Sequence, residues 1–280
     1  MFKFFQNLGR SLMLPVAVLP AGAIITGIGN LLNALHVLPT VAMFFSIVGT
    51  AILGQLGLIF AIGVAIGMAK KNDGAVALAG ALGYAMVTKV LNPENVATLF
   101  NIKEKAVNLG FTKMDNSNVF LGIIIGLIAA YSFNKFSEVE LPMALSFFSG
   151  KRLVPIMTVF FSTILAVILL FIWPMVFSGI VAFGEWLVGF GSFGAFLYGV
   201  FNRLLIPTGL HHALNAVFWF DTAGINDIGK FQTGVDAVKG ITGRYQAGFF
   251  PIMMFGIPAA ALAMYHSAET KQQKQVWGWF

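Results

Sequence analysis

The sequence contains no cysteine and few charged residues, and both shortages narrow the class of protein. Without cysteine, the chain cannot form a disulfide, a thiolate metal site or a cysteine nucleophile. Charged residues make up 10% of its 280 residues, compared with about 25% in typical soluble domains. With 17 basic and 11 acidic side chains, a soluble protein of this length could not cover its surface. The composition also excludes an intrinsically disordered chain.

The abundant residues are apolar or small. Hydrophobic side chains account for 58% of the chain, which includes 29 Phe and 31 Gly. This composition is typical of packed transmembrane helices, in which small residues let neighbouring helices approach closely. The sequence therefore predicts an integral membrane protein.

The net charge of +6 does not indicate nucleic-acid binding, because the basic residues are spread thinly between apolar runs and form no basic face. In a membrane protein this pattern is an orientation signal. The sequence also contains no Walker, Rossmann, zinc-binding or hydrolase motif. Neither a metal nor a cofactor is expected.

Long uncharged stretches predict the membrane spans. Residues 11–69 contain no Asp, Glu, Lys or Arg, and because one span needs about 20 residues, this stretch holds two. His36 and Pro39 mark the turn between them. The predicted spans are 12–33, 42–68, 74–92, 116–134, two within 153–202, and a final one at 247–266.

The stretch 153–202 is interrupted only by Glu185, and a break near Pro174 or Gly184 would divide it into two spans. Glu185 itself is either an interfacial residue or a partner for a basic group. A shorter, irregular segment follows at 203–220. The predicted fold class is all-α: a polytopic helical membrane protein with a broken or re-entrant helical segment near 203–220.

The N-terminus has two interpretations. Lys3 and Arg10 resemble the charged start of a cleaved signal peptide, but the apolar sequence continues far beyond the length of one. Apolar residues at helical spacing from Phe2 to Leu12 favour a short interfacial helix that leads into the first span. The distribution of Lys and Arg favours a cytoplasmic N-terminus.

The segment 203–220 is the candidate functional site. Ionisable and amide side chains at membrane depth are costly and usually face a cavity. Helix-interrupting residues at that depth are tolerated only against protein or water, and transporters build substrate sites from broken helices. The pattern favours a polar, neutral ligand such as a sugar; the alternative is a helix end at the membrane surface. The residues concerned are Arg203, Pro207, Thr208, Gly209, His211, His212 and Asn215.

A second polar cluster, Gly150-Lys151-Arg152, opens an apolar span. On its own this pattern favours a positive-inside anchor. Trp173, Trp219 and Tyr265 are interpreted as members of aromatic belts, although Trp219 could also stack on a sugar ring.

Three separated stretches together resemble one family. They are 202–214, 150–155 and 248–265, and they resemble the membrane-embedded C component of sugar-specific enzyme II in the glucose superfamily of the bacterial phosphoenolpyruvate-dependent phosphotransferase system. The resemblance runs from the Phe-rich start to about residue 275. Thr208 after Pro207, and the stretch 215–220, resemble members specific for N-acetylglucosamine.

The resemblance implies a homodimeric permease in the bacterial cytoplasmic membrane, in contact with its lipids. Such a protein binds sugar outside and presents the C6 hydroxyl to the phosphocysteine of a B domain, which is charged through an A domain and HPr. Arg203 and His211 align with residues that contact the sugar, and Thr208, Gly209, His212 and Asn215 are further candidates. Lys151, with Gly150 and Arg152, aligns with the opening of the transport part. Residues 1–150 then form the dimer-interface and vestibule part, and 151–280 begin the transport part.

The sequence departs from the family in two ways. It lacks the Gly-Ile/Val-Thr-Glu-Pro motif whose Glu binds sugar, and it lacks the cysteine-bearing B domain. No catalytic residue is therefore assigned, and the chain is interpreted as truncated and inactive by itself as a sugar phosphotransferase. The alternatives are a glucose- or maltose-specific member, a sugar facilitator that does not phosphorylate, and an inactive membrane remnant.

Overall fold

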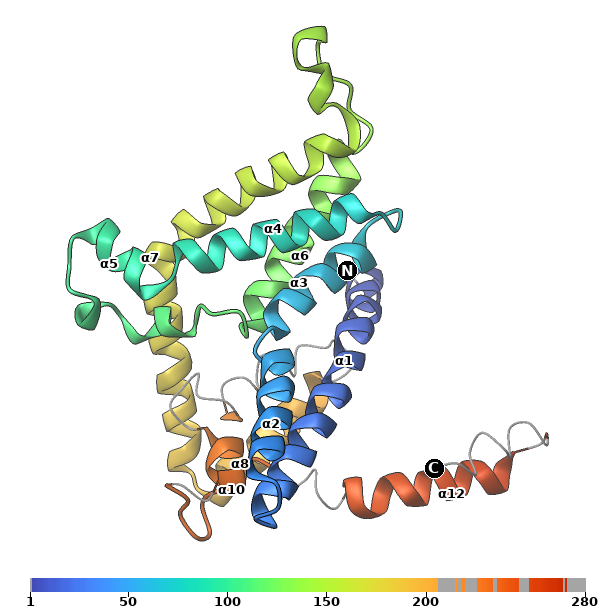
Figure 1. The fold of residues 1–280 in the computed structure, drawn as a ribbon, viewed down its shortest axis with the longest axis vertical. Coiled ribbons are helices and arrows are strands. Elements are labelled where there is room, and N and C mark those ends of the chain that lie inside the picture. Colours follow the sequence, from blue (N-terminus) through green and yellow to red (C-terminus); the bar gives the residue numbers. More distant parts are fainter. Residues whose placement is uncertain are drawn as a thin grey trace. The chain divides into compact units, whose positions relative to one another are not determined.

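The computed structural model describes residues 2–205, 215, 218–219, 226–233, 236–246, 252–268 and 270. These residues form helices and connecting turns, with no β-strand among them, in agreement with the predicted all-α class (Figure 1). The helices are α1 (Phe2–Ala34), α2 (Pro39–Leu53), α3 (Leu56–Met68), α4 (Gly74–Val90), α5 (Pro93–Phe100), α6 (Val119–Phe136), α7 (Leu153–Gly189), α8 (Ser192–Leu205), α10 (Asp227–Thr233) and α12 (Ile257–Ser267). Short 3₁₀ segments η1 to η4 (Glu104–Ala106, Leu109–Lys113, Met143–Phe148 and Gly150–Arg152) connect some of them, and a π-helical turn, η7 (Ile252–Gly256), precedes α12.

The chain divides into two compact units, and each is described by itself. The first contains Met1–Gly179, and the second contains Ile180–Leu204 and the described residues after position 214. The assignment of residues 1–150 to a dimer-interface and vestibule part and of 151–280 to a transport part stays a prediction.

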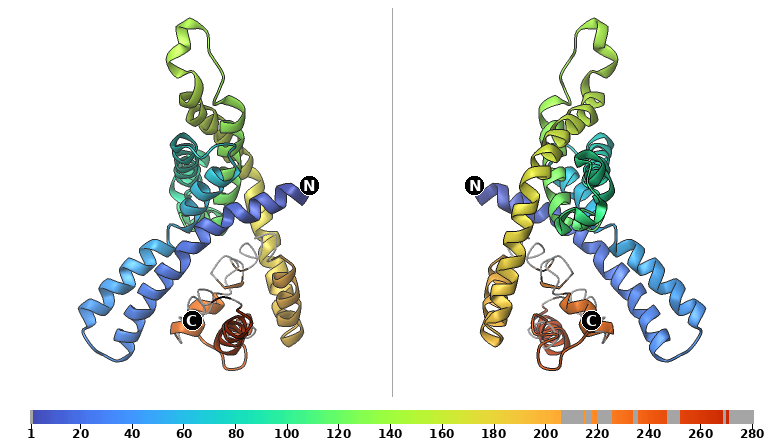
Figure 2. Two further views of the ribbon diagram at one scale, coloured as in Figure 1. Left: turned by 90° about the vertical axis from the view of Figure 1, so that its right-hand side faces the viewer. Right: turned by 90° about the vertical axis from the view of Figure 1, so that its left-hand side faces the viewer.

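Helices α1 and α2 form a hairpin in the first unit (Figure 2). The turn falls where the sequence placed it: α1 ends at Ala34 and Pro39 opens α2. The helices pack closely through glycine, because a Cβ on Gly29 would lie 2.6 Å from the backbone nitrogen of Ser46. The predicted N-terminal helix leads directly into the first span, because α1 runs without interruption from Phe2 through Pro15 and Pro20. Its interfacial position stays a prediction.

The predicted span 42–68 is a bent pair of helices. α2 and α3 meet at a 42° bend at Gly54 and Gln55, and α4 and α5 meet at 57°. Among the described residues, three helices are long and apolar enough to cross a membrane, or five candidate spans if each bent pair counts as one. This is fewer than the seven spans that the sequence predicted, of which the last, 247–266, lies partly outside the described residues.

Helix α3 packs against α4 and α6 to form the centre of the first unit. Gly122 on α6 approaches α3 so closely that a Cβ there would lie 2.2 Å from the Gly57 carbonyl oxygen. The Tyr84 hydroxyl of α4 donates to the carbonyl of Asp115 at 2.9 Å, which ties α4 to the loop before α6. Tyr84 is fully buried.

Helix α7 corrects the predicted division of 153–202. The helix continues through both Pro174 and Gly184, and it ends at Gly189. The break lies at Phe190 and Gly191, where Gly191 has a φ of +58° that favours glycine. The helix that follows, α8, has 14 residues and is too short for the second span, which needs about 20.

Trp173 also differs from its predicted place in an aromatic belt. Its side chain is buried at 3% exposure and donates from Nε1 to the Gly110 carbonyl at 2.8 Å, while its ring stacks on Phe120. Trp173 therefore fastens the 104–114 loop to α7.

Candidate functional site

The polar centre of the second unit lies on the buried face of α8. Tyr198 donates its hydroxyl to Asn215 Oδ1 at 2.8 Å, and Asn202 Nδ2 lies 3.2 Å from the same hydroxyl oxygen. Asn202 Nδ2 also donates to Asn215 Oδ1. All three side chains are buried, so these hydrogen bonds are shielded from competing solvent. We call Tyr198, Asn202 and Asn215 the amide–phenol cluster.

One acceptor atom of this cluster has no partner in the part of the chain that the structure describes. Asn202 Oδ1 is buried and has no hydrogen bond among the described residues. A buried acceptor without a partner costs free energy, so a position of this kind is a candidate for contact with a ligand or a water molecule. The next residue, Arg203, lies in the last turn of α8 with an exposed side chain.

Aromatic side chains pack around the amide–phenol cluster. The rings of Tyr198, Phe218 and Tyr245 lie within 5.3 Å of one another, centroid to centroid, and Leu187 packs with them. Trp219 donates from Nε1 to the Tyr245 carbonyl at 3.4 Å. This packing fixes the position of the Tyr198 hydroxyl and, through it, the two amides.

A buried carboxylate fixes the turn that carries Tyr245. Asp227, at the start of α10, accepts a hydrogen bond from the Gly243 backbone nitrogen at 2.7 Å and another from Gln246 Nε2 at 3.2 Å. Gly243 has a φ of +88°, a conformation that L-residues rarely adopt. The carboxylate thus uses both oxygens to hold the 236–246 turn against α10.

The structure locates only part of the predicted site. Arg203 ends α8, and Asn215 lies in the amide–phenol cluster. Thr208, Gly209, His211 and His212 lie outside the described residues, as does most of the predicted broken segment. The assignment of Arg203 and Asn215 as sugar contacts stays a prediction.

The sequence interpretation missed three polar residues of the centre. Tyr198 and Asp227 lie outside the motif that drew attention to this region, and no local pattern marks their burial. Asn202 does precede Arg203 in that motif, so a polar residue in an apolar run was an available signal.

The Gly150-Lys151-Arg152 cluster lies in the first unit and joins two loops. Lys151 Nζ lies 2.5 Å from Asp73 Oδ2, and Asp73 also caps α4 by accepting from the Ala75 nitrogen at 2.9 Å. The bond to Lys151 and the bond from Ala75 hold the pKa of the Asp73 carboxyl below its usual range. Gly150 has a φ of +66°, and its nitrogen donates to Val139.

Arg152 stabilises the loop before α7. Its Nη1 donates to the Phe147 carbonyl at 3.0 Å, and its guanidinium lies 4.7 Å from the centroid of the Phe147 ring. Within the described part of the chain, no group of three His, Asp or Glu side chains could hold a metal ion.

Comparison with known proteins gives the family. The family described as "Phosphotransferase system, EIIC" matches residues 9–280. The N-acetylglucosamine-specific EIICB component of Bacillus subtilis is 44% identical over 278 residues, which are 99% of this chain and 56% of that protein. The N-acetylglucosamine-specific EIICBA component of Escherichia coli is 44% identical over 289 residues, or 98% and 40% of the two chains. The N-acetylglucosamine-specific EIIC component of Streptomyces coelicolor is 41% identical over 293 residues, or 99% and 68%.

The chain belongs to the EIIC family of the phosphotransferase system. This membership and the apolar helices make it a multi-pass protein of the bacterial cytoplasmic membrane. The chain spans 56% and 40% of the lengths of the first two relatives. The members of this family are components of the phosphotransferase system, which couples sugar transport to phosphorylation.

Proposed function

We propose that the chain binds an N-acetylglucosamine-type hexose and carries it across the membrane for phosphorylation at the C6 hydroxyl. The observation that carries this proposal is the likeness to three N-acetylglucosamine-specific components over at least 98% of the chain. The glucose-specific alternative has less support, because these three relatives share the other specificity.

The chemistry of the second unit suits a neutral sugar. Arg203 offers several hydrogen-bond donors at the end of α8, and the imidazole of His211 can donate or accept. Asn202, the neighbour of Arg203 in the last turn of α8, belongs to the amide–phenol cluster, and its Oδ1, which has no hydrogen bond among the described residues, can accept from a hydroxyl group. The proposed sugar contacts are Arg203, Thr208, Gly209, His211, His212 and Asn215.

The phosphoryl donor in this proposal is a phosphocysteine on a B domain. The 280 residues contain no cysteine, so this group belongs to a domain or chain outside them. Phosphoryl transfer depends on the alignment of donor and acceptor and on stabilisation of charge. The role of the present chain is therefore to hold the sugar hydroxyl in position. The B domain would be charged through an A domain and HPr, and the permease would act as a homodimer.

Sugar binding by two variants tests the site. We expect Arg203→Ala and His211→Ala each to weaken binding by about 1–3 kcal/mol, because each leaves a polar group of the bound sugar without its partner. This loss corresponds to roughly a 5- to 150-fold rise in Kd. The measurement is equilibrium dialysis of the protein in lipid nanodiscs against labelled N-acetylglucosamine.

Matched variants control for a general loss of charge or of imidazole. Arg10→Ala removes an exposed arginine from α1, and His266→Ala removes an exposed histidine from α12. Both should keep the affinity of the unmodified protein. Unchanged affinity in Arg203→Ala and His211→Ala together would reject the site and favour a helix end at the membrane surface.

A further inference from the structure

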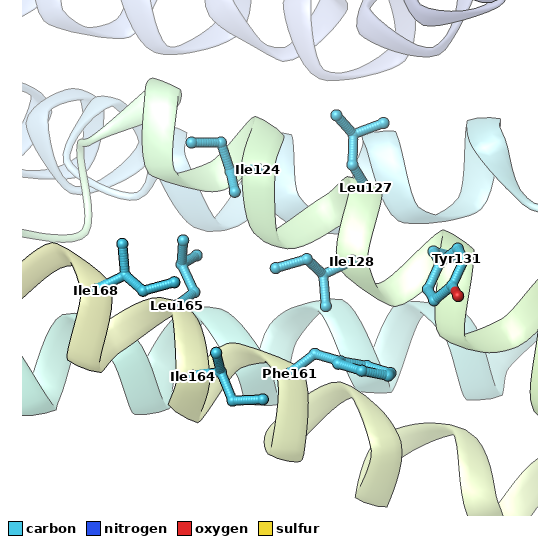
Figure 3. Close-up of a pocket in the computed structure, with 8 residues that line it drawn as sticks. All are labelled: Ile124, Leu127, Ile128, Tyr131, Phe161, Ile164, Leu165 and Ile168. Atoms are coloured by element: carbon cyan, nitrogen blue, oxygen red, sulfur yellow. The ribbon is translucent and has the colours of Figure 1, made fainter.

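An open, apolar groove runs between α6 and α7 on the first unit (Figure 3). Its volume is about 410 Å³. Ile124, Ile128 and Tyr131 line it from α6, and Phe161, Ile164 and Ile168 line it from α7. Both helices are long and apolar enough to cross a membrane, which would place the groove at the depth of the acyl chains. From Ile124 to Tyr131 it extends about 10 Å along α6, at a rise of about 1.5 Å per residue.

A cation lies one helical turn beyond the end of this groove. Lys135 Nζ is 3.2 Å from the Tyr131 hydroxyl and 5.6 Å from the ring centroids of both Tyr131 and Phe136. Its side chain is exposed, and among the described residues no carboxylate forms an ion pair with it. The aromatic rings hold the ammonium group at the mouth of the groove by cation–π attraction.

We propose that this groove binds an anionic phospholipid, with an acyl chain between α6 and α7 and the phosphate on Lys135. An apolar groove with the ammonium group of Lys135 at one end complements a molecule with an apolar tail and an anionic head. The Tyr131 hydroxyl, beside the ammonium group, can donate a second hydrogen bond to a phosphate oxygen.

The residues of the groove favour a lipid over a helix from a second copy. Helices associate in membranes mainly through small residues, which let backbones approach closely. The glycines of α6 already serve this purpose against α3: a Cβ on Gly126 would lie 2.8 Å from the Ala61 carbonyl oxygen. The groove side of α6 carries bulky side chains instead, and a flexible acyl chain fits between them.

Native mass spectrometry of the purified protein tests the proposal by counting retained lipid. The probes are phosphatidylglycerol and phosphatidylcholine with identical acyl chains. We expect Lys135→Gln to lower the affinity for phosphatidylglycerol about five-fold, as one lysine contributes about 1 kcal/mol to binding an anionic headgroup. Binding of phosphatidylcholine should not change. Lys135→Arg should restore the preference, which separates loss of charge from loss of fold.

A second set of variants tests the groove by filling it with a tryptophan side chain. Ile164→Trp should lower retention of both lipids, whereas Val167→Trp, at an exposed position of α7 outside the groove, should not. Lys89→Gln removes a cation from the last turn of α4 and serves as the charge control. Inorganic phosphate should not displace phosphatidylglycerol.

Three results would overturn the proposal. The first is equal retention of phosphatidylglycerol by Lys135→Gln and Lys89→Gln. The second is a change of oligomeric mass in Ile164→Trp with lipid retention intact, which would make the groove a protein interface. The third is displacement by inorganic phosphate, which would reduce the site to a binding site for a free anion.

Discussion

At the scale of single residues, the contact of Lys151 with Asp73 shows what a motif alone cannot reveal. The sequence marks Gly150-Lys151-Arg152 as a positive cluster before a span, and a positive-inside anchor explains that pattern. The partner of Lys151 lies in the loop before α4, far away in the sequence. Asp73 also caps α4, so one carboxylate connects the start of α4 to the start of α7.

Two substitutions separate the cap from the ion pair. Asp73→Asn keeps a side-chain acceptor for the Ala75 nitrogen but removes the charge that faces Lys151, whereas Asp73→Ala removes both. We expect the thermal unfolding temperature in detergent to fall in the order unmodified protein, Asp73→Asn, Asp73→Ala. Equal values for the two variants would show that the cap contributes nothing.

The same pair predicts how stability depends on pH. The folded pKa of Asp73 lies below the ordinary value of 3.8, so the ionised carboxylate stabilises the fold at pH values above that figure. The contribution is lost as pH falls through the folded pKa and Asp73 takes up a proton. The difference in unfolding temperature between the unmodified protein and Asp73→Asn should therefore be present at pH 6 and shrink below about pH 4.

The polar centre of the second unit was only partly predictable, because its contacts join residues that lie far apart in the sequence. Arg203 and Asn215 stand out as polar residues in an apolar run. The surroundings of Asn215 depend on Tyr198 and Tyr245, which come together only when α8 and the 236–246 turn pack. Sequence spacing identifies the candidates, whereas tertiary packing decides which polar atoms are buried.

At the scale of elements, glycine determines how closely the helices of the first unit pack. In α1, Gly27 and Gly29 are two residues apart and have different surroundings. A Cβ on Gly29 would meet the Ser46 nitrogen and the Ala42 carbonyl oxygen of α2, whereas a Cβ on Gly27 would meet nothing within 4 Å. Backbone atoms cannot move aside as a flexible side chain can, so a larger residue at position 29 requires α1 and α2 to shift relative to each other.

These two glycines form a matched test of the α1–α2 hairpin. Gly29→Ala should destabilise the protein by about 1–3 kcal/mol, the usual cost of overpacking. Gly27→Ala should be neutral or stabilise by up to about 1 kcal/mol, through the higher helix propensity of alanine. The measurement is thermal unfolding in detergent, and similar effects of the two substitutions would contradict the packing described for α1 and α2.

The elements were predicted well where charge and turn residues mark the boundary. The uncharged stretch 11–69 predicted two spans with a turn at His36 and Pro39, and α1 and α2 are joined there, although α2 already begins at Pro39. The break after α7 was misplaced because Pro174 removes only one hydrogen-bond donor from a long helix, and a membrane helix can absorb that loss. The bend at Gly54 and Gln55 was missed because no charged residue accompanies it.

At the scale of the whole molecule, the sequence alone indicated the family, and the comparisons confirmed it. The composition excluded soluble classes, and three separated motifs narrowed the membrane proteins to one family. The sugar and the phosphoryl donor rest on the proposal, since the chain spans 56% and 40% of the first two relatives.

The central claim is that this chain forms a binding site for an N-acetylglucosamine-type sugar. The most direct measurement is competition dialysis of the unmodified protein in lipid nanodiscs, with labelled N-acetylglucosamine displaced by unlabelled N-acetylglucosamine or glucose. The proposal predicts saturable binding that unlabelled N-acetylglucosamine displaces at a lower concentration than glucose does. Absence of saturable binding, or displacement by glucose at the lower concentration, would contradict it.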